Sequence, residues 1–135
     1  MELGGWYLLA GHGRKYMPVF KKPKNIDVLM ILELISSKNE GVIILENIDV
    51  EDGVKPENLT LYFENGNYLL MLLDFDEEGF IDVRTPYNSK AEKGEFQNIL
   101  GEPYGATTIV QDIELIKRCF IEFNTIGNVS RELMT

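Results

Sequence analysis

Residues 59–75 read LTLYFENGNYLLMLLDF, two largely apolar runs separated by Asn65-Gly66. Both central positions of a type I′ turn need a positive φ, which Asn and Gly tolerate, so this pair predicts a tight β-hairpin. Every second side chain of the first run is aliphatic or Phe, as expected for a strand with one buried face. We therefore expect two antiparallel strands here.

Further strands are predicted on both sides of this hairpin, at residues 5–11, 42–45, 80–84 and 107–110. The first two are rich in aromatic or branched aliphatic side chains, which suit a pleated surface. Gly79 allows a turn before the third. Residues 14–24 are basic and contain Pro18 and Pro23, so they are predicted to be irregular. The strands together predict an antiparallel meander.

Two helices are predicted. The first begins with Asn25 as N-cap and runs to about Lys38. Its apolar residues lie nearly all round, so we expect a sheet to cover it well. The second begins after Asp112 and runs to about Asn124, and the last eight residues form a predicted surface tail held by Val129 and Leu133. Four apolar residues at helical spacing form its predicted buried stripe: Ile113, Ile116, Phe120 and Phe123.

The chain length of 135 residues fits one domain, and 44% apolar residues suffice for a hydrophobic core. The element order is a strand, a helix, several hairpin-linked strands and a second helix. The predicted fold is therefore a single α+β domain over residues 1–135, an antiparallel β-meander sheet with two main α-helices packed against it.

The net charge of −9, from 22 acids and 13 bases, excludes classes of partner. Binding to nucleic acid needs surplus Lys and Arg for the phosphates. Docking on an anionic membrane needs the same surplus. An acidic protein instead attracts a cationic partner, while a solvated face that keeps the chain soluble is the plainer interpretation.

The charge is unevenly distributed. Residues 1–24 carry five bases and one acid, whereas residues 40–82 carry twelve acids and one base, a net charge of −11. If the meander gathers these acids on one side, they form a negative surface for a cationic protein. The predicted binding residues are Glu46, Asp49, Glu51, Asp52, Glu57, Glu64, Asp76, Glu77 and Glu78.

No familiar catalytic or metal site is predicted. The segment from Asp74 to Asp82 resembles the start of a calcium loop, but Thr85 stands where the bidentate Glu should be, which favours an acidic β-turn. His12 is the one histidine and has no assignable nucleophile beside it. Cys119 falls at the buried side of the second helix and is predicted to pack in the core. We expect no cofactor and no enzymatic activity.

The compartment is predicted from the cysteine count and the N-terminus. A single cysteine cannot form an intramolecular disulfide, which suits a reducing compartment. The first residues lack the basic and apolar regions of a secretory signal. The apolar runs are shorter than the roughly 20 residues that a membrane span needs. We expect a cytoplasmic monomer.

Three stretches are similar to parts of certain bacterial immunity proteins. They are residues 4–20 (GGWYLLAGHGRKYMPVF), residues 99–106 (ILGEPYGA) and residues 120–130 (FIEFNTIGNVS). Such proteins guard a cell against contact-dependent or other polymorphic toxins, whose toxic domains are often basic nucleases. The resemblance implies a binding partner, the C-terminal toxic domain of a cognate toxin, and no catalytic residues, because these proteins act by blocking.

The function predicted from the charge and the resemblance is an immunity protein that neutralises a basic toxin through an acidic surface. A few apolar anchors would add to the charge, with Tyr62, Tyr68, Phe75 and Phe80 as candidates where they face outward. Two alternatives remain open from the residues alone. One is a small acidic metal-dependent hydrolase, and the other is a structural or regulatory adaptor that self-associates through a sheet edge.

Overall fold

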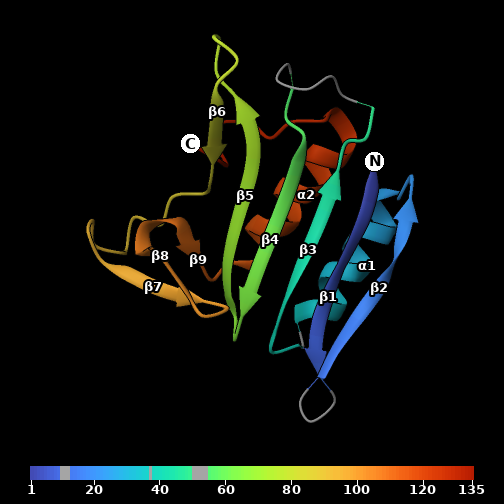
Figure 1. Cartoon of the computed structure of the whole chain (residues 1–135), viewed down its shortest axis with the longest axis horizontal. Coiled ribbons are helices and arrows are strands. Elements are labelled where there is room, and N and C mark those ends of the chain that lie inside the picture. Colours follow the sequence, from blue (N-terminus) through green and yellow to red (C-terminus); the bar gives the residue numbers. More distant parts are fainter. Residues whose placement is uncertain (10–12, 37, 50–54) are drawn as a thin grey trace.

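A computed structural model describes residues 1–9, 13–36, 38–49 and 55–135 of the chain (Figure 1). Seven strands form one antiparallel sheet in the order β2-β1-β3-β4-β5-β6, with β9 paired to β5. The strands are β1 (Glu2–Leu9), β2 (Gly13–Lys21), β3 (Glu40–Glu46), β4 (Asn58–Glu64), β5 (Asn67–Phe75), β6 (Ile81–Arg84) and β9 (Ile109–Val110).

The central hairpin of β4 and β5 forms as the sequence predicts. Asn65 and Gly66 both have positive φ, 48° and 79°, and Glu64 faces Asn67 across the two-residue turn. This register places the side chains of Leu59, Leu61 and Phe63 on one face of β4, where all are buried. The hairpin is therefore the centre of the core.

Both helices, α1 (Asn25–Ser36) and α2 (Ile113–Ile126), lie on one side of the sheet (Figure 1). The Asp112 carboxylate caps α2 by accepting hydrogen bonds from the N–H groups of Glu114 and Leu115. Gly127 ends α2 in the left-handed conformation. The buried residues of α2 are Ile116, Cys119, Phe120 and Phe123, close to the predicted stripe. The α+β prediction is confirmed.

The opposite side of the sheet carries a smaller layer. The hairpin of β7 (Phe96–Ile99) and β8 (Glu102–Gly105), a 3-10 turn (Ala106–Thr108) and β9 follow one another there. Leu69, Ile99 and Ile109 form a second buried cluster. Because Leu69 alternates with Leu70 of the main core, this cluster lies on the face away from the helices. The sequence predicted the short strand β9 but not the β7–β8 hairpin.

Two other predictions were wrong. Residues 13–21 form the edge strand β2 rather than an irregular segment, and an edge strand tolerates Pro18 because one side of it has no strand partner. Helix α1 is not covered all round, since Ile26 and Met30 are 60% and 63% exposed. Its end at Ser36 is close to the predicted end at about Lys38. The C-terminal segment is held by buried Val129, and half-buried Leu133 packs against the core as well, so this prediction is confirmed; buried Met134 adds to them.

Candidate functional site

One end of the sheet is strongly acidic. Strands β3 and β5 finish there, and β4 and β6 begin there, so the connections after β3 and after β5 lie at the same end (top of Figure 1). The hydrogen bond from Asn47 N–H to the Glu57 carbonyl, 2.8 Å, ties the first connection to the start of β4. Six predicted site residues lie here, and we call them the acidic end: Glu46, Asp49, Glu57, Asp76, Glu77 and Glu78.

Five of these six side chains are exposed, and Glu57 is half-buried. Within the described residues, none of the six carboxylates forms an ion pair with Lys, Arg or His. The Asp76 carboxylate accepts hydrogen bonds from the N–H groups of Glu78 and Phe80, both 2.9 Å, which holds the turn between β5 and β6 in shape. The acidic end is thus a group of carboxylates that no described cation neutralises, with hydrogen bonds that shape the turn at Asp76.

The other three predicted residues do not join this group. Glu64 lies at the opposite end of β4, where its carboxylate accepts a hydrogen bond of 2.8 Å from Leu100 N–H. It links the central hairpin to the β7–β8 layer, which is a structural role. Glu51 and Asp52 lie outside the described residues.

Exposed apolar side chains accompany the acidic end. Phe80 and Ile81, directly after the acidic turn, are 65% and 68% exposed, and Ile48 in the other connection is 52% exposed. Of the four anchor candidates, Phe80 alone is exposed, because Tyr68 is buried and Tyr62 and Phe75 are half-buried. Aromatic side chains, Phe among them, are enriched at protein–protein interfaces relative to the rest of the surface.

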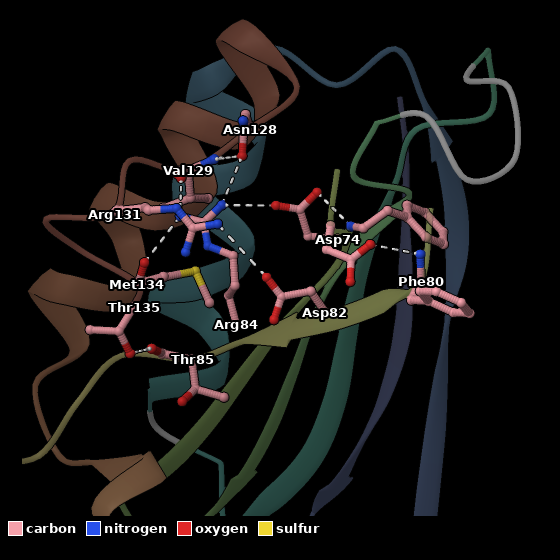
Figure 2. Close-up of polar contacts among 12 residues, drawn as sticks. Asp74, Phe80, Asp82, Arg84, Thr85, Asn128, Val129, Arg131, Met134 and Thr135 are labelled. Carbon is pink, nitrogen blue, oxygen red and sulfur yellow. Dashed lines mark hydrogen bonds and ion pairs between the residues drawn. The ribbon is translucent and has the colours of Figure 1, made fainter. Parts of the chain in front are cut away.

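A second group of charges lies close by but is buried (Figure 2). Arg84 on β6 is 2% exposed, and its Nη1 donates to Asp74 Oδ2 at 3.1 Å. Its Nη2 donates to the carbonyls of Val129 at 2.6 Å and Met134 at 3.0 Å. Arg84 therefore joins the β5–β6 hairpin to the C-terminal segment. Sequence reasoning missed this role, although a hairpin turn at residues 76–79 does place Arg84 diagonally across from Asp74.

Comparison with known proteins gives the family. A family model matches residues 1–133. The chain belongs to DUF6911, a family of unknown function. This DUF6911 chain is similar to the crystal structure of a hypothetical protein from Neisseria gonorrhoeae, with 24% sequence identity and a TM-score of 0.81. The likeness covers 96% of this chain and 89% of that one, and it shows the fold. No curated protein matches the chain.

In the described part of this DUF6911 chain, no group of three or more His, Cys, Asp or Glu residues could hold a metal ion. The segment from Asp74 to Asp82 forms a hydrogen-bonded turn, with Asp74 bound to Arg84. His12 lies outside the described residues. No described helix has the length and apolar character needed to cross a membrane.

Four groups of this DUF6911 chain have shifted pKa values, and three of them, Cys119, Tyr68 and Lys117, belong to the core and the helix layer. Burial raises the pKa of the Cys119 thiol to about 12, and the Glu122 carboxylate adds to the rise. Burial also raises the pKa of the Tyr68 hydroxyl, while the nearby Lys117 charge opposes the rise. Hydrogen bonds from Lys117 to the carboxylates of Glu33 and Glu114 raise the pKa of Lys117 and tie α1 to α2. A thiol held neutral in the core is a poor nucleophile.

Proposed function

We propose that this protein is an immunity protein, which binds a cognate toxin domain of basic character and blocks it. The observation that carries the proposal is the acidic end: six carboxylates without ion pairs to described residues, next to exposed Phe80 and Ile81. The resemblance of residues 4–20, 99–106 and 120–130 to immunity proteins supports the same function.

The mechanism is obstruction rather than catalysis. A basic cleft that binds nucleic acid presents Lys and Arg to phosphates, and fixed carboxylates can take the place of those phosphates. Long-range attraction accelerates the encounter, while Phe80 and Ile81 become buried on contact and slow dissociation. The protein in this proposal is a cytoplasmic monomer without a cofactor or an activity of its own.

The proposal predicts that a large exported protein with a variable C-terminal domain is encoded directly upstream, and that this domain is the toxin to use in the test. Co-expression of this protein should rescue cells from that domain, and surface plasmon resonance should detect a complex of the two. Glu77→Lys with Glu78→Lys should lower the association rate by about tenfold at low salt and flatten its salt dependence. Asp76 stays unchanged because it shapes the turn.

The matched control is Glu92→Lys with Glu95→Lys, an equal charge change at two exposed carboxylates outside the acidic end. This control should leave the association rate nearly unchanged. Phe80→Ala should raise the dissociation rate instead. If the control and the acidic-end variant lower the association rate equally, the acidic end is not the interface. If the protein neither rescues the cells nor forms a complex with the toxin domain, the immunity function is wrong.

A further inference from the structure

A long apolar groove lies between the edge strand β2 and helix α1. Its volume is about 620 Å³, within the range of protein ligand and peptide sites. Met17 and Phe20 of β2 point toward the helix layer, because they pair with Gly5 and with buried Leu3 of β1. We call this feature the β2–α1 groove. It lies at the edge of the sheet opposite to β6 (Figure 1).

Helix α1 extends the apolar surface beyond the groove. Leu34 lines the groove and is 41% exposed, and Met30 and Ile26 follow it at intervals of four residues with exposures of 63% and 60%. Residues four apart lie on one face of a helix, so these side chains form a continuous stripe. On the other wall Phe20 is 44% exposed. A contiguous apolar surface of this kind marks an interaction site.

The surroundings of the groove are cationic. Residues 13–24 carry five bases and no acid. Lys15 and Lys21 line the groove and are six residues apart on β2, about 20 Å at the rise of a strand. Neither forms an ion pair within the described residues. The two acids of α1 are engaged elsewhere: Asp27 accepts from Lys24 N–H, and Glu33 binds Lys117 of α2.

These charges argue against a second copy of the chain as the occupant. A symmetric dimer through the groove would bring the lysines of two β2 strands together. Continuous pairing of two β2 edges is also opposed, because Pro18 lacks an N–H and the β1–β2 register shifts between Leu3 and Gly5. The occupant must therefore carry opposite charge and an apolar face of its own.

We propose that the β2–α1 groove binds an acidic amphipathic helix of a partner protein. Such a helix would lie beside α1 as the next member of the helix layer, with its apolar face on the stripe and the groove. Its carboxylates would face Lys15 and Lys21 on the two ends of β2. Helix α1 has 12 residues and is about 18 Å long, so a partner helix of three to four turns matches it.

The experiment uses a designed capped helix of about 15 residues, with Leu on one face and Glu elsewhere. Added to the full ¹⁵N-labelled chain, it should bind with a Kd on the order of 10 µM and shift amide resonances of β2 and α1. The same peptide with Lys in place of Glu should bind at least about tenfold more weakly at low salt. Phe20→Asp and Met30→Asp, at positions that are 44% and 63% exposed, should each weaken binding by about tenfold or more.

The matched control is Val83→Asp, an exposed apolar residue on the far edge of the sheet and outside the acidic end, which should leave peptide binding unchanged. Peptide binding at the groove is measured without the toxin domain, so a failure here would leave the proposed function of the acidic end untouched. The proposal fails if the Glu peptide does not bind at millimolar concentration, if the Lys peptide binds equally well, or if the shifts lie outside β2 and α1. Dodecanoate below its micellar concentration is the last arm: shifts with dodecanoate and none with the peptide would assign the groove to a small amphiphile instead.

Discussion

The β5–β6 hairpin uses acidic residues in two opposite ways within a few residues of each other. At its tip Asp76, Glu77 and Glu78 are exposed and form no ion pair with described residues. At its base Asp74 is buried and bound to Arg84 (Figure 2). The two sets of carboxylates belong to one acidic run in the sequence, so their number alone does not reveal their roles. The pleat and register decide which of them meets a buried arginine.

This contrast implies that the base carries stability, while the tip has no such role and is left for the proposed binding. The largest expected effect is therefore at the base. Arg84→Met leaves the Asp74 carboxylate buried without its cation and removes the donors to the carbonyls of Val129 and Met134. We expect the free energy of unfolding to fall by about 3–5 kcal/mol, measured by urea denaturation.

Arg131→Ala is the control for that substitution. Arg131 lies 3.7 Å from Asp82 but its side chain is 67% exposed, so water screens the pair and its loss should cost less than about 1 kcal/mol. Similar losses for the two arginines would break the distinction between buried and exposed charge in this corner of the molecule.

Met134 tests whether the C-terminal segment is part of the base. Its side chain is fully buried, and Met134→Ala leaves a cavity while keeping the carbonyl that Arg84 binds. We expect a loss of about 2–3 kcal/mol in urea denaturation. Met30→Ala should change stability by less than about 0.5 kcal/mol, because Met30 is 63% exposed and Ala favours a helix. Equal effects would mean that the segment does not pack as described.

Local signals made part of this fold predictable. The turn at Asn65-Gly66 and the spacing of Ile116, Phe120 and Phe123 are signals that span only a few residues. The central hairpin and α2 could therefore be predicted from the sequence alone. Strand β2 could not be predicted in this way, because Pro18 argues against a strand and, among the described residues, β1 is its one strand partner. A strand formed by pairing depends on its neighbour more than on its own composition.

Part of the candidate site was also predictable and part was not. Alternate connections of an antiparallel meander lie at the same end of the sheet, so the predicted strand order is enough to bring the six acids of the acidic end together. The role of Arg84 does not follow in this way, because Val129 and Met134 lie 45 and 50 residues away and act through backbone carbonyls that no side chain reveals. The exposed stripe of α1 was missed because an apolar helix is ordinarily buried all round.

A smaller effect is expected from Cys119, which is buried in α2 beneath the sheet. Burial raises its pKa from 9.0 to about 12 in the folded protein, so at high pH the unfolded chain ionises first. The thiol's effect on stability is therefore absent below pH 9 and becomes a loss as pH rises toward 12. One pH unit above the ordinary value the loss is about 1.4 kcal/mol, and Cys119→Ala should remove this component of the alkaline profile. An unchanged profile in that variant would mean that the thiol is not held neutral.

The smallest expected effect on stability is at the tip. Glu77→Gln with Glu78→Gln keeps the Asp76 turn and removes two exposed charges from a crowded acidic end. Stability should change by less than about 0.5 kcal/mol, and the change should be a gain, because repulsion among the carboxylates is relieved. The gain should vanish near physiological salt, where the screening length is about 8 Å. A loss above about 1 kcal/mol at any salt concentration would mean that these carboxylates stabilise the fold, and the tip would then resemble the base rather than a surface kept for a partner.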